Sequence, residues 1–137
     1  MKDLDVVEKR VKNVTAMRSS KDAVSVIVAT RNERENIVAL MKSIYEQAYR
    51  PIEVVAVDAG SSDGTFEMLS DLSGDLEGDD FRLKVLREED FGATRSPANA
   101  RNIGVLNSSG EYVIFVDADM ALCDKDFVER VRIALDM

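Results

Sequence analysis

Residues 111–120 read EYVIFVDADM, and the rest of the chain can be interpreted outward from this stretch. Its β-branched and aromatic run from Tyr112 to Val116 predicts a strand that is buried on both faces. Ser108-Ser109-Gly110, directly before it, is a typical turn signal. Strands buried on both faces are typical of parallel sheets covered by helices, so the stretch favours an α/β fold.

Two acids, Asp117 and Asp119, follow this strand with Ala118 between them. Because side chains alternate along an extended chain, we expect both carboxylates to point to one side. A hard divalent cation such as Mg²⁺ or Mn²⁺ would relieve their mutual repulsion, and open α/β sheets bind ligands at this edge. The alternative is a solvated turn whose acids cap the next helix, and the motif alone does not choose between the two.

Chain length, net charge and the lengths of the apolar runs limit the possible classes of protein. With 137 residues it is long enough for one domain with a substantial core. Its net charge of −8 disfavours nucleic acid or an anionic membrane as a general partner, since both require basic patches. No apolar run approaches the roughly 20 residues that would span a bilayer.

The cysteine and histidine counts restrict the chemistry. Cys123 is the only cysteine, which excludes an internal disulfide and fits a reducing, cytoplasmic compartment. The sequence has no histidine, which excludes Ser/His/Asp and Cys/His catalysis and disfavours a zinc site. Acid–base chemistry must therefore come from carboxylates, lysine or tyrosine.

The chain divides into two unequal parts. Near the start, four apolar residues recur at helical spacing and predict an amphipathic helix: Leu4, Val7, Val11 and Val14. A short polar linker follows this helix. We expect this helix, with its linker at residues 1–20, to pack on the domain or on a second subunit, which would make a homo-oligomer. Residues 21–137 then form the α/β domain.

Strand and helix patterns alternate through that domain. We expect strands at 24–29, 53–57, 83–86 and 112–116, with helices between them and after the last. Residues 71–80 and 88–95 are expected to be loops, Ser96-Pro97 to start a helix, and Asn32 and Asp124 to cap helices. This alternation predicts a mainly parallel open sheet with helices on both faces.

Polar residues stand at three expected strand ends: Thr30 to Glu33, Asp58, and the Asp117–Asp119 pair. Parallel strands end at one edge, so we expect a single crevice that also includes Arg101 and the Gly/Ser loop at 59–65. Asp58 could accept hydrogen bonds from a nucleobase or a ribose. A metal on Asp119 could bridge a diphosphate and make it a good leaving group.

Four segments, taken in order, resemble the family 2 glycosyltransferases of the GT-A fold: VSVIVATRNE at 24–33, VDAGSSDGT at 57–65, ARNIG at 100–104 and FVDAD at 115–119. The resemblance covers residues 23–127. It implies a nucleotide-diphosphate sugar donor of the UDP or GDP type, inverting transfer, and Mg²⁺ or Mn²⁺. The acceptor, whether a glycan, a lipid or a small molecule, stays open.

The resemblance also implies roles by position. Thr30, Arg31 and Glu33 would line the nucleotide pocket, and Asp58 would bind the base. The other three residues would contact the nucleotide and the metal. Arg101 would reach the nucleotide, Asp117 would approach the ribose and the metal, and Asp119 would ligate the metal.

The chain departs from the family pattern at several positions. Ala29 and Arg31 stand where many members have proline and an aromatic residue, although the Arg31 guanidinium could stack on a base. Ala121 replaces a glutamine that is frequent in members acting on polyprenyl phosphates. No residue matches the family's general base, which we expect beyond Met137, together with any part that would associate with a membrane. We therefore expect an incomplete domain that binds the donor but turns it over slowly or not at all.

Three other classes remain as alternatives. An aspartyl phosphotransferase would carry its Asp-x-Asp motif after the first strand, whereas in this chain the motif follows the fourth expected strand. A receiver-like domain with Asp58 as phosphate acceptor would need an acid pair at the first strand, where this chain has Thr30 to Glu33. A non-catalytic nucleotide-binding or assembly module would retain the crevice without chemistry. A dinucleotide-binding oxidoreductase is disfavoured because no G-x-G-x-x-G follows the first strand.

Overall fold

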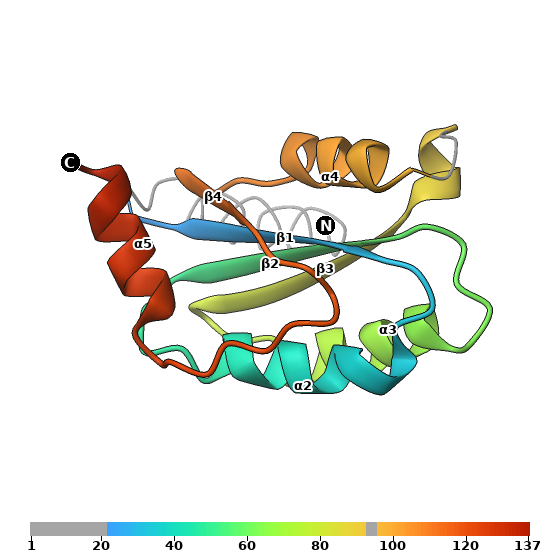
Figure 1. Cartoon of the computed structure of the whole chain (residues 1–137), viewed down its shortest axis with the longest axis horizontal. Coiled ribbons are helices and arrows are strands. Elements are labelled where there is room, and N and C mark those ends of the chain that lie inside the picture. The colour runs from blue at the N-terminus through green and yellow to red at the C-terminus, as the bar shows by residue number, and fades with distance from the viewer. Residues whose placement is uncertain (1–21, 93–95) are drawn as a thin grey trace, which may run out of the picture.

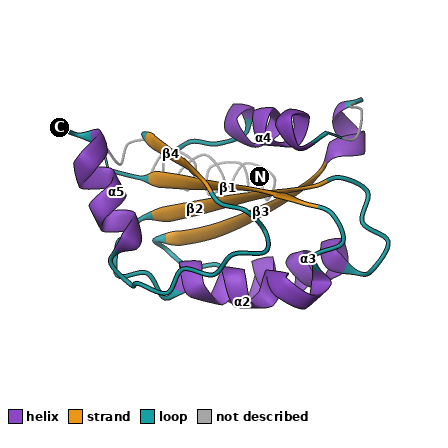
Figure 2. Ribbon diagram, in the orientation of Figure 1, coloured by secondary structure: helices purple, strands orange, loops and turns teal. Residues whose placement is uncertain are grey.

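A computed structural model describes residues 22–92 and 96–137 as a four-stranded sheet with helices on both faces (Figure 2). The order of the strands is β3-β2-β1-β4 and every pair is parallel. The expected α/β class is thereby confirmed. The bounds of the strands are β1 Val24–Thr30, β2 Ile52–Asp58, β3 Phe81–Arg87 and β4 Tyr112–Phe115.

The helices form layers around this sheet (Figure 1). Helices α2 (Arg34–Tyr45) and α3 (Thr65–Leu76) lie on one face, and α4 (Pro97–Leu106) covers the other. Helix α5 (Phe127–Leu135) lies at the end of the sheet where β1 begins, and a short 3-10 helix, η1 (Glu88–Phe91), follows β3. The expected N-terminal helix and linker fall outside the described residues. None of the described helices is long and apolar enough to cross a bilayer.

The core consists of two clusters, one on each side of the sheet. The alternation of side chains along β1 and β2 sends residues such as Val26 and Val54 toward α2 and α3, where the larger cluster lies. The opposite residues, such as Ile27 and Val55, pack with Ala100 of α4 in the smaller cluster. Both central strands are therefore buried on both faces, as their apolar sequences predict.

Strand β4 differs from its prediction. It ends at Phe115 rather than Val116, and it is an edge strand that pairs only with β1. Because α4 packs over β1 and β2, the Phe115 side chain on that face stays 53% exposed. The expected burial of this strand on both faces is therefore wrong, since an apolar run does not reveal whether a strand lies at the centre or at an edge.

The expected loop at residues 71–80 is partly wrong, because α3 continues to Leu76. Leu72 and Leu76 pack against the larger core cluster and extend the helix through the acidic, glycine-containing stretch. Tertiary packing of one face here overrides a composition that is typical of a loop.

Two expected caps are also wrong. Asn32 lies before α2 with φ 54°, and its side chain does not cap that helix. At α5, the side chain of buried Gln47 accepts a hydrogen bond from the Val128 N–H at 3.0 Å, whereas Asp124 receives the N–H of Asp126 outside the helix. Leu135, the last residue of α5, is 55% exposed. Ser96, by contrast, caps α4 as expected, accepting from the Asn99 N–H.

The close approach of α4 to the sheet depends on Gly104. A Cβ at this position would lie 2.4 Å from the Ile27 Cγ2 atom. We expect Gly104→Ala to lower the free energy of unfolding by about 1–2 kcal/mol, because overpacking outweighs the better helix propensity of alanine. Gly74→Ala in α3 is the matched control, since a Cβ there meets nothing within 4 Å, and it should raise stability by up to about 1 kcal/mol. Urea denaturation measures both, and equal stabilisation by the two changes would contradict the packing argument.

Candidate active site

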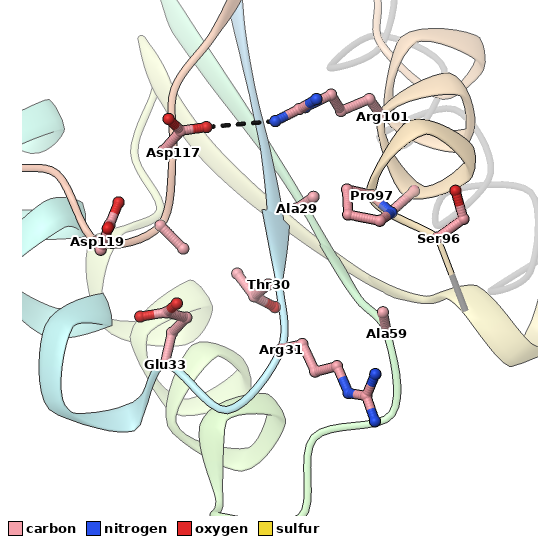
Figure 3. A pocket seen from close by; sticks show the side chains of 12 residues that line it. Ala29, Thr30, Arg31, Glu33, Ala59, Ser96, Pro97, Arg101, Asp117 and Asp119 are labelled. Carbon is pink, nitrogen blue, oxygen red and sulfur yellow. Dashed lines mark hydrogen bonds and ion pairs between the residues drawn. The ribbon is translucent and has the colours of Figure 1, made fainter.

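Two neighbouring cavities lie at the carboxyl ends of the strands. The first has a volume of about 370 Å³ and is shown in Figure 3. The β1–α2 loop, the start of α4 and the segment after β4 converge on it. Its lining residues are Ala29, Thr30, Arg31, Glu33, Ala59, Ser96, Pro97, Ala100, Arg101, Asp117, Ala118 and Asp119.

Asp117 and Asp119 both line this cavity, but not for the reason that strand alternation suggested. Strand β4 has already ended, and the Met120 N–H donates to the Asp117 carbonyl oxygen at 3.1 Å, which closes a turn. Ala118 packs into the core at 6% exposure and holds this turn against the domain, while both carboxylates stay exposed. The buried alanine between the two acids is what presents them to the cavity.

The two acids have different partners. Arg101 of α4 points toward Asp117, and its Nη2 lies 3.3 Å from the Asp117 Oδ1 (Figure 3). No cation of the described residues pairs with Asp119. Glu33, on the far side of the cavity from Arg101, accepts a hydrogen bond from the Asn36 side chain at 3.0 Å.

Asp58 lines a second cavity of about 320 Å³, so the expectation of a single crevice is wrong. The residues around this second cavity are Asp58, Gly60, Ser61, Phe66, Glu67, Arg87 and Glu89. The Thr30 hydroxyl, which belongs to the first cavity, donates to the Asp58 carboxylate at 2.9 Å. The N–H and hydroxyl of Ser61 donate to the same carboxylate. Asp58 is only 3% exposed, and Thr30 links it to the first cavity.

Arg87 of the second cavity, together with its neighbours Phe66 and Glu89, was not predicted from the sequence. The Arg87 guanidinium lies 3.9 Å from the centroid of the Phe66 ring and 3.5 Å from a Glu89 oxygen. Arg87 is the last residue of β3, at the same sheet edge as Asp58, which it faces in the strand register. The rule that ligands bind at strand ends could have found it, had the predicted strand not ended one residue early at Leu86.

The loop that carries Arg31 and Glu33 is tied to the loop after β2. The N–H groups of Asn32 and Glu33 donate to the hydroxyls of Ser61 and Thr65 at 2.8 and 2.9 Å. In return, the Ser62 N–H donates to the Asn32 side-chain oxygen at 2.8 Å. These reciprocal bonds explain the left-handed backbone of Asn32 and make the two loops one unit.

Asp63 joins the first turns of two helices. Its carboxylate accepts the N–H of Arg34 in α2 at 3.2 Å and the N–H of Thr65 in α3 at 3.0 Å. The hydrogen bond from the Thr65 hydroxyl, followed by these backbone bonds, lowers the pKa of Asp63 below its ordinary value. The charged carboxylate is therefore the form that stabilises both helix starts.

This sets a pH dependence with a definite sign. A folded pKa below the unfolded one contributes stability above the unfolded pKa of about 3.9, and that stability is lost as the pH falls through the folded pKa. We expect Asp63→Asn to be less stable than the native chain at pH 7, and the difference in urea midpoint to shrink toward pH 3. An unchanged difference at both pH values would contradict the role of the charge.

The donor set at the first cavity fits a divalent cation. The acids Asp117 and Asp119 supply the oxygen ligands that Mg²⁺ and Mn²⁺ prefer. Among the described residues no group of three histidine, cysteine or acidic side chains is placed to form a complete metal cage. A pair of carboxylates fits a cation that takes its other ligands from phosphates and water, as Mg²⁺ commonly does.

Comparison with known proteins agrees with this geometry. A sequence profile described as "Glycosyl transferase family 2" matches residues 25–134. The chain is 35% identical over 110 residues to glycosyltransferase GlyA of Streptococcus pneumoniae, a match that covers 80% of this chain and 14% of GlyA. It is 31% identical over 103 residues to a poly-beta-1,6-N-acetyl-D-glucosamine synthase of Staphylococcus epidermidis, covering 75% of this chain and 23% of that protein.

Two solved structures share the fold. S. aureus TarS in complex with UDP-GlcNAc superposes with a TM-score of 0.69 and 30% identity, covering 83% of this chain and 31% of TarS. The mannosyltransferase PcManGT of Pyrobaculum calidifontis, in complex with GDP-Man and Mn²⁺, gives a TM-score of 0.68 and 28% identity, covering 93% of this chain and 38% of that one. This chain thus spans well under half the length of these relatives. The profile match over most of the sequence shows that the chain belongs to glycosyl transferase family 2.

Proposed function

We propose that this chain binds a nucleotide-diphosphate sugar together with Mg²⁺ or Mn²⁺, as the donor-binding part of an inverting glycosyltransferase. The observation that carries the proposal is the pair of cavities at one sheet edge, linked by the hydrogen bond from Thr30 to Asp58. One cavity offers acids and an arginine, and the other offers a buried acid beside an arginine stacked on a ring. Such a division suits a ligand with a charged end and an aromatic end.

The second cavity is where we place the nucleobase. Asp58 can accept a hydrogen bond from a base N–H, and Arg87 can donate to a base carbonyl oxygen. Both uracil and guanine present an N–H beside a carbonyl, so this pair of residues is compatible with UDP and with GDP. Thr30, whose hydroxyl links the two cavities, would face the ribose in this proposal, with Arg31 alongside.

The first cavity is where we place the diphosphate, the metal and the sugar. Asp119 and Asp117 would hold the cation, and Arg101 would donate hydrogen bonds to the diphosphate. When bound, the cation supplies electrostatic stabilisation of the leaving diphosphate. Glu33, which lines the same cavity opposite Arg101, would contact the donor.

The acceptor and the general base are left unassigned in this proposal. Among the described residues, none matches the family's base, and the relatives are much longer than this chain. We propose that the chain by itself binds donor while transferring sugar slowly or not at all. In this proposal the sugar would pass to a hydroxyl group of a glycan, a lipid or a small molecule.

Isothermal titration calorimetry tests the proposal. UDP, GDP, UDP-GlcNAc and GDP-mannose are each titrated into the full chain with excess Mn²⁺ and again with EDTA in place of the metal, and ADP serves as the control nucleotide. We expect binding of a UDP or GDP compound that requires the cation. Absence of heat with every nucleotide, from a protein that is folded by circular dichroism, would refute donor binding.

A further inference from the structure

The ion pair between Arg101 and Asp117 joins two residues that the proposed function assigns to different groups. The guanidinium is assigned to the diphosphate, and the carboxylate to the cation. The two side chains nevertheless pair with each other across the cavity, with Nη2 of Arg101 3.3 Å from Oδ1 of Asp117. Binding of a cation at Asp117 and of a diphosphate at Arg101 would therefore give both side chains new partners.

A cation bound to Asp117 would conflict with this pair. It would lie within a few Å of the guanidinium, where two positive charges repel each other. Both side chains are exposed, at 44% for Arg101 and 64% for Asp117, so the pair can open without burying or stranding a charge. Arg101 is also long enough, on a rigid helix, to move from one partner to another within the cavity.

Arg101, rather than the other arginine of the cavity, is the partner of Asp117. Its lining cations among the described residues are Arg31 and Arg101, against the acids Glu33, Asp117 and Asp119. Arg101 is the one that Figure 3 shows turned to the acid pair, whereas Arg31 points toward Ala59 on the other side. Arg101 thus supplies the positive charge beside Asp117 before any cation arrives.

We propose that Arg101 is an exchangeable counterion, which holds Asp117 in the ligand-free site and passes to the diphosphate when a divalent cation takes its place. The proposal rests on the proposed donor binding. Its consequence is cooperative binding: the ion pair weakens the binding of the cation alone, and the released guanidinium strengthens the binding of the cation with a diphosphate. By linkage, each ligand then raises the affinity for the other.

The test measures the two affinities separately in Arg101→Gln, which removes the charge, and in Arg101→Lys, which keeps it. Binding of Mn²⁺ alone is measured by the electron paramagnetic resonance signal of the free ion. Binding of UDP and of GDP at saturating Mn²⁺ is measured by calorimetry. Arg82→Gln is the control, because Arg82 pairs with Glu77 at the amino end of β3, far from both cavities in the fold.

We expect Arg101→Gln to bind Mn²⁺ alone about two- to fivefold more tightly, and the nucleotide with Mn²⁺ roughly tenfold more weakly. Arg101→Lys should fall between the native protein and Arg101→Gln in both measurements, because lysine keeps the charge but lacks the planar guanidinium donors. Arg82→Gln should match the native protein in both. Arg101→Met replaces the glutamine variant should that variant fail to fold.

The exchange is overturned if Arg101→Gln binds Mn²⁺ alone no more tightly than the native protein, or if its nucleotide affinity is unchanged. If the native protein binds nucleotide and Arg101→Gln gives either of these results, the exchange is refuted and the proposed function is unaffected. A native protein that binds neither UDP nor GDP with Mn²⁺ refutes the proposed function, and the exchange with it.

Discussion

Asp119→Ala is expected to weaken the binding of nucleoside diphosphate with Mn²⁺ by at least about 100-fold. Loss of a residue that merely supports a metal ligand costs about 10- to 100-fold in metal affinity, and loss of a direct ligand should cost no less. Asp119 is exposed and no cation of the described residues pairs with it, so its carboxylate is free to act as that ligand. Calorimetry with UDP and GDP at fixed Mn²⁺ measures the effect.

The control for this prediction is Asp71→Ala. Asp71 is an exposed acid of α3 that lines neither cavity, and its removal changes the net charge by the same amount. Both variants should melt at nearly the native temperature, because neither carboxylate is buried. Equal nucleotide affinities for the two variants would refute the assignment of Asp119 to the metal.

Glu53→Leu is expected to lower the free energy of unfolding by about 2–4 kcal/mol. Glu53 is 1% exposed in the central strand β2, and its carboxylate accepts three hydrogen bonds. The donors are the Ser25 hydroxyl at 2.7 Å and the N–H and hydroxyl of Ser109 at 2.8 and 3.1 Å. Leucine fills the space but leaves these donors without acceptors, at about 1–3 kcal/mol for each group that stays buried.

Glu53→Gln is the matched control for this effect. Its amide oxygen can accept two of the three bonds and its NH₂ group can donate to the Ser109 oxygen, so we expect a loss of less than about 1.5 kcal/mol. Urea unfolding with a common slope compares the two variants. If leucine is tolerated as well as glutamine, the carboxylate does not anchor the turn before β4.

Local sequence patterns were sufficient to predict those strands and helices whose structure depends mainly on their own residues. The apolar runs of β1 and β2, the periodic face of α2, and the Ser96-Pro97 start of α4 all lie where their sequences predict. The alternation of these elements predicts a parallel sheet, because parallel strands need crossover helices. The residues at the ends of β1 and after β4 were therefore expected at one edge, and they do line one cavity.

The failures concern partners that lie far away in the sequence. Asn32 was expected to cap its own helix, yet it bonds to Ser62 of another loop. The cap of α5 comes from Gln47, some eighty residues earlier, and no local signal marks it. A polar side chain takes whichever donor the fold brings within reach, and a sequence pattern sees only its near neighbours.

The sequence by itself determined the class of fold and the sheet edge at which the polar residues gather. Strand periodicity and the rule for strand ends depend only on local residue types, which explains this success. Only the tertiary structure decided that Asp58 and Arg87 share a second cavity, that a turn around buried Ala118 presents Asp117 and Asp119, and that Arg101 pairs with Asp117. Each of these depends on how separate elements pack, because packing sets which side chains face each other across the gaps between them.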